Sequence, residues 1–190
     1  MNLAILASHN GSALDSIYTA INNQELDLKL KIIVSNNTNA NVLQKAKNYN
    51  IKYSVINANL FKNPDQEILQ TLQQEEIECI FLAGYMKKLS PIITHNFKVI
   101  NSHPALLPKF GGKGMYGRFV HEAVIQNKEK ISGVTIHEVN ENYDEGKIIL
   151  QQSLTLNKDE TVQSLEERIK KLEKIVIVKG LKRCLSSQST

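Results

Sequence analysis

Short apolar runs alternate with segments of helical periodicity through the first half of the chain. The runs are rich in isoleucine, leucine and valine and have the length of strands. They lie at Leu3–Ala7, Lys31–Ser35, Tyr53–Ile56, Cys79–Ala83 and Val99–Ser102. Because strands that alternate with helices along a sequence normally build a parallel sheet, the pattern predicts an α/β fold.

Two of the connecting helices carry start signals. The sequence Asn63-Pro64-Asp65 supplies a capping amide, a first-turn proline and an acid ahead of an apolar stripe at Ile68, Leu69 and Leu72. The other helix is expected to begin at Ser12 and to bury Leu14, Ile17 and Ile21. It therefore follows directly on the first predicted strand.

The second half of the sequence no longer alternates between short strands and helices. Residues 110–117 are too rich in glycine for the interior of a helix or strand, so a surface loop or lid is expected there. Two further strands are then expected at Ile131–Val139 and Ile148–Leu156. A polar turn, Asn140–Lys147, joins them, and Gly146 can take a positive φ in it.

A long final helix is expected from about Glu160. Its apolar stripe consists of Val162, Leu165, Ile169, Leu172 and Val176. The tail from Leu185 to Thr190 is expected to be loose. No repeat or linker divides the 190 residues, so the sequence predicts one domain.

Composition narrows the classes of function. The net charge is +4, but the lysines are scattered apart from a run between Lys170 and Lys182, which suits a small phosphorylated substrate as well as a nucleic acid. Cys79 and Cys184 lack metal-ligand or redox spacing, so we expect neither a disulfide nor a metal site. No signal peptide or membrane span is recognisable, which favours the cytoplasm.

Ligands of open α/β sheets bind beyond the carboxyl ends of the parallel strands, and polar clusters follow several of the predicted strands. The turn Ser8–Ser12 could hold a phosphate on its backbone N–H groups, or it could simply be a turn that needs glycine and a serine N-cap. The residues Gly84–Lys87 suit a flat aromatic ligand, with core packing of Met86 as the alternative.

Asn101 and His103 form the most informative cluster. Strand alternation directs both side chains to one side, and Pro104 and Pro108 stiffen the segment after the strand. An amide with a protonated imidazole can stabilise an oxyanion, and a neutral imidazole can accept a proton. The pair therefore predicts acyl-type transfer.

A carboxylate in the later turn could orient His103. Asp144 is the candidate, although Glu141 and Glu145 lie in the same turn. His137 and Thr135 share one face of the preceding strand, and this histidine is either a supporting residue of the site or a satisfied core residue.

In order along the chain, these motifs resemble those of the phosphoribosylglycinamide formyltransferases, folate-dependent enzymes of purine synthesis. The resemblance covers residues 1 to about 178. It is carried by Asn10-Gly11-Ser12, Gly84-Tyr85-Met86, Asn101-Ser102-His103-Pro104 with Leu106-Leu107-Pro108, and Val134-Thr135-Ile136-His137 through Asp144-Glu145-Gly146. It implies a Rossmann-like fold whose mostly parallel twisted sheet is flanked by helices, with a late antiparallel strand and a long C-terminal helix.

The resemblance also implies a role for each matching residue. Asn101, His103 and Asp144 would be the catalytic trio, supported by His137 and Thr135. Formyl transfer would run from 10-formyltetrahydrofolate, without a metal, to the amine of glycinamide ribonucleotide. The folate would lie against Tyr85, Met86, Lys87, Leu89, Asn140, Glu141 and Tyr143. The amine substrate would contact Gly11, Ser12, Ala13, Lys62, Pro104, Lys170 and Glu173.

Some positions depart from the family pattern. The usual residues are glycine where His9 stands, asparagine where Ala13 stands, isoleucine where Ser102 stands and arginine near Lys62, and the loop at 111–117 is longer. Loss of the amide at position 13 should weaken phosphate binding.

Other readings remain open. Related enzymes formylate methionyl-tRNA or an amino sugar, or hydrolyse formyl-folate, but each normally carries another domain for which we expect no room here. A degenerate folate- or nucleotide-binding module is the non-enzyme alternative. The expected partners are small molecules, without nucleic acid or membrane, and the chain is expected to be a monomer or a homodimer.

Overall fold

The computed structural model describes residues 1–186. The chain forms two compact units, residues 1–100 and the segment from Asn101 onward. The strand order is β3-β2-β1-β4-β5-β6-β7, and strand β5 (Lys98–His103) spans the boundary between the units.

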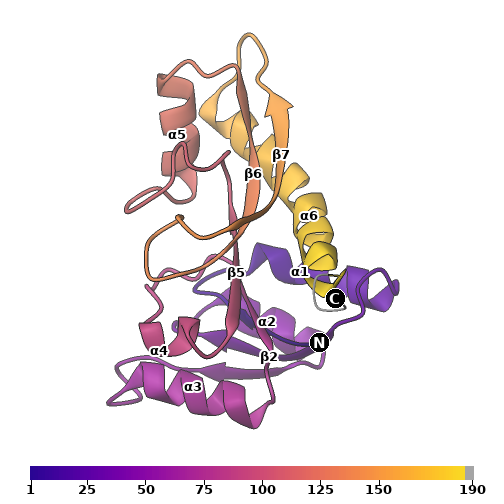
Figure 1. Ribbon diagram of the computed structural model, residues 1–190, viewed down its shortest axis with the longest axis vertical. Helices are drawn as coiled ribbons and strands as arrows, with labels where there is room; N and C mark the ends of the chain where they lie inside the picture. The colour runs from indigo at the N-terminus through magenta and orange to yellow at the C-terminus, as the bar shows by residue number, and fades with distance from the viewer. Residues whose placement is uncertain (187–190) are drawn as a thin grey trace. The chain divides into compact units, whose positions relative to one another are not determined.

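The first unit is a parallel sheet with its helices (Figure 1). Its strands β1 (Asn2–Leu6), β2 (Lys29–Ser35), β3 (Lys52–Val55) and β4 (Cys79–Leu82) pair in parallel in the order β3-β2-β1-β4. The connecting helices are α1 (Ser12–Asn22), α2 (Asn41–Asn48) and α3 (Pro64–Gln74), and the short α4 (Pro91–Thr94) follows β4. The predicted alternation of strands and helices is confirmed.

The central strand β1 is apolar throughout because both of its faces are buried. Leu3, Ala4, Ile5 and Leu6 are all 0% exposed. A strand buried on both faces has no solvent-facing positions, so its sequence does not alternate between apolar and polar residues.

The helix start predicted at Asn63 is confirmed. The Asn63 side chain accepts a hydrogen bond from the backbone N–H of Gln66 at 3.3 Å, and Pro64 is the first residue of α3. Helix α1 also begins at Ser12, but its N-cap is Gly11, with φ 53°, and no side chain caps it. The expected need for glycine in this turn is therefore confirmed, whereas the serine N-cap was wrong. Ile21 is only half-buried because Ala20 occupies the buried face.

The second unit is built around a hairpin. Strands β6 (Ile131–Glu138) and β7 (Ile148–Thr155) pair antiparallel, as predicted. Helix α6 (Val162–Ser186) packs along both strands and against α5 (Arg118–Gln126) (Figure 1).

Helix α6 begins slightly later than Glu160. The Thr161 hydroxyl accepts the backbone N–H of Ser164 at 3.1 Å, which is a capping arrangement, so the helix starts at Val162. In the predicted stripe, Leu165, Ile169 and Val176 are buried, while Val162 and Leu172 are half-buried. The helix extends through Leu185 and Ser186, so the prediction of a loose tail was wrong for these two residues. Positions 187–190 lie outside the described residues.

The turn between β6 and β7 differs from the prediction. Asp144, not Gly146, has the positive φ, at 58°. Gly146 is needed for another reason, since a Cβ there would lie 1.7 Å from the carbonyl oxygen of Glu138. The turn thus folds back on the end of β6.

Gly146→Ala is expected to destabilise the protein by about 2 kcal/mol, since the added methyl group must displace the backbone at Glu138. Chemical denaturation would measure the loss. Gly112→Ala is not a suitable control, because the φ of Gly112 is 95° and any side chain there would be strained. Glu145→Ala is the control, since it changes an exposed position of the same turn. It should reduce stability by less than about 0.5 kcal/mol, as substitutions at surface sites usually do. Equal effects of the two substitutions would contradict this account of Gly146.

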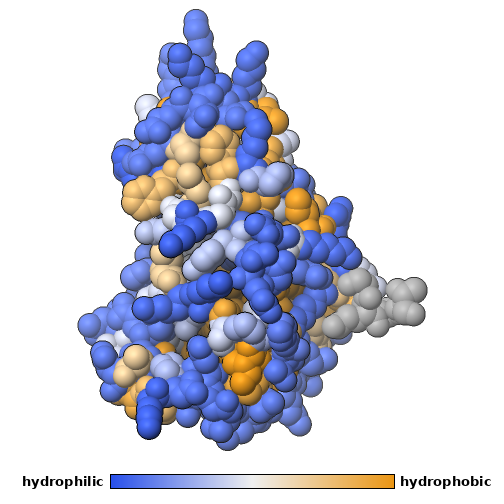
Figure 2. Space-filling model, turned by 60° about the vertical axis from the view of Figure 1, so that its left-hand side comes forward, coloured by the Kyte–Doolittle hydropathy of each residue, from blue (hydrophilic) through white to orange (hydrophobic). Residues whose placement is uncertain are grey.

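The face shown in Figure 2 is mostly hydrophilic, with apolar side chains in small patches. Exposed large apolar residues include Tyr116 and Phe119, whose rings pack edge to face with their centroids 5.4 Å apart. Cys79 and Cys184 are both buried thiols. Within residues 1–186, none of the helices combines the length and apolar character needed to cross a bilayer.

Candidate active site

Four polar side chains of the second unit form one connected cluster. The carboxylate of Asp144 lies 3.6 Å from Nδ1 of His103 through one oxygen and 3.6 Å from Nε2 of His137 through the other. The amide nitrogen of Asn101 lies 3.2 Å from the same Nε2 of His137. Strand β5 supplies Asn101 and His103, β6 supplies His137, and the following turn supplies Asp144. Residues distant in sequence thus meet at one point.

Backbone carbonyls fix which nitrogen of each imidazole carries a proton. Nε2 of His103 lies 2.8 Å from the carbonyl oxygen of Phe110, and Nδ1 of His137 lies 2.9 Å from that of Glu138. A carbonyl only accepts, so these two nitrogens must donate. The neutral form of His137 then has a lone pair on Nε2 that accepts the amide N–H of Asn101, and the neutral form of His103 has its lone pair on Nδ1, beside Asp144.

Burial controls the charge of both imidazoles. It lowers the pKa of His103, opposed by the Asp144 carboxylate and by the hydrogen bond to Phe110. It also lowers the pKa of His137, opposed by the Glu138 carbonyl and then by Asp144. The resting cluster therefore favours neutral histidines next to a carboxylate that stabilises the cation once one forms.

The same burial predicts acid sensitivity. His103, His137 and His121 all have pKa values lowered mainly by burial, from an ordinary 6.5. Protons therefore bind the unfolded chain first as the pH falls. The contribution of each buried, neutral histidine to the free energy of unfolding is fully present above about pH 6.5. Below that pH the contribution falls, by up to about 1.4 kcal/mol per pH unit for each histidine.

Denaturation midpoints at pH 7.5 and 5.5 would measure this loss. His121→Gln should reduce the difference between the two midpoints, because His121 is 2% exposed and its Nδ1 has no partner in the described residues. His95→Gln, at an exposed position, is the matched control and should leave the difference unchanged. Equal stability of the unmodified protein at the two pH values would contradict the argument.

The loop at 110–117 holds Asp144 in place. The backbone N–H of Gly112 donates to the Asp144 carboxylate at 2.8 Å. A Cβ at Gly111 would lie 2.5 Å from Cδ2 of Leu107 and 3.2 Å from Cβ of Asp144, so a larger residue there would have to displace the Leu107 side chain. The segment contains no helix or strand, as predicted, and it contributes to the cluster through its backbone.

The structure also distinguishes the three acids of the turn. The Asp144 side chain is 13% exposed and faces the histidines, whereas Glu141 and Glu145 are exposed. The positive φ of Asp144 accounts for the difference, because it reverses the chain at that residue. Asn140 and Tyr143 of the same turn are exposed as well.

Thr135 supports the segment that follows His103. Its buried hydroxyl donates to the carbonyl of Ala105 at 2.6 Å and accepts the backbone N–H of Leu107 at 3.0 Å. Gln151 on β7, which the sequence did not single out, donates to the same hydroxyl at 2.9 Å and to the carbonyl of Leu107 at 2.8 Å. These bonds hold the half-buried Pro104 and its neighbours against the hairpin.

Helix α6 adds a further carboxylate. Glu173 accepts a hydrogen bond from the Ser102 hydroxyl at 2.6 Å. Lys170 is exposed and its ammonium donates to Glu166 at 2.6 Å. A surface ion pair between Lys170 and Glu173, which was the simple alternative for this face, is not the arrangement found.

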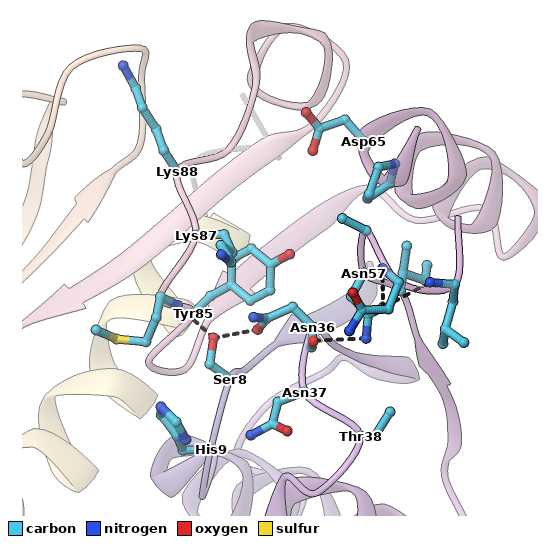
Figure 3. Close-up of a pocket in the computed structure, with 16 residues that line it drawn as sticks. Ser8, His9, Asn36, Asn37, Thr38, Asn57, Asp65, Tyr85, Lys87 and Lys88 are labelled. Carbon is cyan, nitrogen blue, oxygen red and sulfur yellow. Dashed lines mark hydrogen bonds between the residues drawn. The ribbon is translucent and has the colours of Figure 1, made fainter. Parts of the chain in front are cut away.

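The first unit has a cavity of about 670 Å³ at the carboxyl ends of its strands (Figure 3). Tyr85, Met86 and Lys87 line it, as do Ser8 and His9. Met86 is 44% exposed, so core packing was the wrong alternative for it. Burial and the Asp65 carboxylate raise the pKa of Tyr85 to about 12, so its hydroxyl stays protonated.

Ser8 links two walls of this cavity. Its hydroxyl donates to the Asn36 side chain at 2.6 Å and accepts the backbone N–H of Met86 at 2.7 Å (Figure 3). The amide of Asn57 in turn donates to the carbonyl of Asn36 at 3.2 Å. Sequence reasoning missed Asn36 and Asn57, although both follow predicted strands and the strand-end rule that selected Ser8 applies to them too.

Other expected ligand residues of the first unit do not line the cavity. Gly11 and Ala13 are buried at the start of α1, where Ser12 is exposed. Leu89 is buried, and Lys62 is exposed. Among residues 1–186, no three His, Cys, Asp or Glu side chains gather in a way that could hold a metal ion.

Comparison with known proteins gives the family. The formyl transferase model matches residues 1–181. The chain belongs to the formyl transferase family. A phosphoribosylglycinamide formyltransferase of Bacillus subtilis (strain 168) is 32% identical over 175 residues, which cover 90% of this chain and 87% of the relative.

Solved structures of formyl transferases agree over the length of the chain. A phosphoribosylglycinamide formyltransferase from Bacillus halodurans superposes with a TM-score of 0.89 at 26% identity, covering 100% of this chain and 97% of that one. A glycinamide ribonucleotide transformylase from Geobacillus kaustophilus gives 0.88 at 30% identity, covering 97% of each. The expected Rossmann-like fold, with its antiparallel end and long C-terminal helix, is confirmed.

Proposed function

We propose that this formyl transferase moves the formyl group of 10-formyltetrahydrofolate to the amine of 5'-phosphoribosylglycinamide, a step of purine synthesis. The observation that carries the proposal is the cluster formed by the buried His103 with the half-buried Asn101 and Asp144, in a chain whose relatives bear that enzyme's name. An amide, an imidazole and a carboxylate are the groups that transfer of a carbonyl carbon to an amine requires.

The chemistry follows from the hydrogen bonds of the resting cluster. Attack of the amine places negative charge on the formyl oxygen. The Asn101 amide nitrogen has two N–H groups and gives one to His137, so the other can bind this oxygen. Removal of the amine's proton lets His103 become an imidazolium, whose two N–H groups face the Asp144 carboxylate and the Phe110 carbonyl. The positive charge formed in this way stabilises the oxyanion. When the oxyanion collapses, the bond between the formyl carbon and the folate nitrogen breaks, and the proton taken up by His103 passes to that nitrogen.

We assign the amine substrate to polar groups of each unit. In the first unit, the N-terminus of α1 at Gly11, Ser12 and Ala13 would bind the phosphate, because the first N–H groups of a helix have no partner within it. Lys62 and Lys170 would add positive charge. In the second unit, Glu173 and the backbone near Pro104 would bind the ribose or glycinamide part.

We assign the folate by the chemistry of its rings. The cavity residues Tyr85, Met86 and Lys87 present an aromatic ring, a thioether and a cation, and Leu89 follows them. In the second unit, the exposed turn residues Asn140, Glu141 and Tyr143 offer backbone and side-chain groups to the polar edge of a pterin.

A reconstituted reaction tests the proposal. The purified protein is mixed with formyl-folate and glycinamide ribonucleotide, and folate absorbance is followed together with formylation of the amine by mass spectrometry. Loss of formyl-folate that requires the amine, with formation of its formyl derivative, is expected. Loss without the amine would identify a hydrolase. No reaction, with folate or nucleotide binding still measurable, would identify a binding module.

A further inference from the structure

Ser102 lies between the two catalytic candidates on strand β5, but its side chain is on the opposite face of the strand. Neighbouring side chains of a strand point to opposite faces. Asn101 and His103 reach the cluster around Asp144, whereas the Ser102 hydroxyl donates to Oε1 of Glu173 on α6 at 2.6 Å. A single hydrogen bond therefore links the strand that carries the catalytic pair to the carboxylate on the helix.

The Glu173 carboxylate depends on this bond. Burial raises the pKa of Glu173, while the Ser102 hydroxyl and, after it, the charge of Lys170 oppose the rise. The Lys170 ammonium itself is bonded to Glu166, so it acts on Glu173 only through its field. Ser102 thus supplies the hydrogen bond that favours the ionised form.

The other charged groups near this part of α6 act on different partners. Helix α5 packs against α6 and carries Arg118 and His121. The electrostatic interactions of His121 are with Glu166, Lys170 and His103, and Arg118 acts on Glu166. Substitution at Ser102 therefore changes the environment of Glu173 without removing a charge.

We propose that Ser102 is a positioning residue that fixes one oxygen of Glu173 so that the other accepts hydroxyl or amine N–H groups of the substrate. The inference rests on the proposed function, because it assigns to Glu173 the ribose or glycinamide part of the acceptor. A carboxylate held by a neutral donor keeps its charge for the substrate, whereas one paired with a lysine would have it neutralised.

Three substitutions separate positioning from simple packing. Ser102→Ala removes the donor, and Ser102→Thr keeps a hydroxyl on the same strand position. Ser132→Ala is the matched control, because Ser132 is a buried serine of the same unit whose hydroxyl has no partner in the described residues.

Steady-state kinetics give the first readout. Ser102→Ala is expected to raise KM for glycinamide ribonucleotide about tenfold, the loss typical of one hydrogen bond to a charged group, with kcat and KM for formyl-folate within twofold. Ser102→Thr should restore KM to within threefold, and Ser132→Ala should not change it. An unchanged KM in Ser102→Ala, an equal loss for both substrates, or failure of the threonine variant would overturn the inference.

A spectroscopic readout keeps the inference testable if the acceptor is another molecule. Carboxyl carbon NMR, with Glu173→Gln to assign the signal, measures the titration of Glu173 in the protein alone. Ser102→Ala should move its midpoint to higher pH, and an unmoved midpoint would overturn the inference. Absence of glycinamide ribonucleotide formylation by the unmodified protein would instead reject the proposed function.

Discussion

Replacing His103 by alanine is expected to lower kcat for formyl transfer by about a thousandfold while leaving the affinity for formyl-folate nearly unchanged. His103 is 3% exposed, its Nε2 donates to the Phe110 carbonyl, and its Nδ1 lies 3.6 Å from the Asp144 carboxylate. It can take the amine's proton and place a positive charge near the developing oxyanion. These interactions matter in the transition state more than in the ground state, so the loss should appear in kcat.

Single-turnover rates and folate binding by calorimetry would measure the two quantities separately. His95→Gln, an exposed histidine of the first unit, is the control and should keep full activity. Circular dichroism checks that His103→Ala is folded, since alanine leaves a gap in the cluster. A folded variant with turnover within tenfold of the unmodified protein would refute the role proposed for His103.

The strand pattern let the catalytic candidates be found before their neighbours were known. Asn101 and His103 lie two residues apart, and alternation along a strand is a local rule that does not depend on the rest of the fold. The same holds for β1, whose unbroken apolar run predicts burial on both faces, and for the capped start of α3 at Asn63. Local rules thus gave the order of elements and the strand-end positions of the site.

Features set by backbone geometry could not be predicted in the same way. Three acids occupy the turn after β6, and Asp144 is the inward one because its own φ is positive, which disfavours most non-glycine residues. The sequence favoured Gly146 for that conformation, yet Gly146 is required by its approach to the carbonyl of Glu138. The Phe110 carbonyl leaves no signal in the sequence at all, since every residue has a carbonyl.

The side chains that contact the candidate catalytic residues could be predicted only in part. His137 could be placed on a face of β6, but its bond to Asn101 depends on how β5 and β6 are brought together. Gln151 and Ser102 likewise find their partners only through tertiary contacts. The candidate catalytic side chains could therefore be chosen from the sequence, whereas the network of contacts around them required coordinates.

Asp144→Asn is expected to lower kcat by about a hundredfold or more with little change in the affinity for either substrate. The asparagine can still accept the backbone N–H of Gly112, so the turn should remain folded. It carries no charge to stabilise an imidazolium at His103. Because Asp144 raises the pKa of His103 against the effect of burial, its loss should lower that pKa further, which proton NMR of the imidazole would detect.

Glu145→Gln provides the matched control, since it removes the neighbouring, exposed carboxylate of the same turn and should leave kcat within twofold. If Glu145→Gln and Asp144→Asn lowered kcat equally, the general negative charge of the turn, and not the contact of Asp144 with His103, would be responsible. If Asp144→Asn lowered kcat while the pKa of His103 stayed constant, Asp144 would act only by orienting the ring. A joint fall of kcat and of this pKa is the result that the 3.6 Å separation of the two groups predicts.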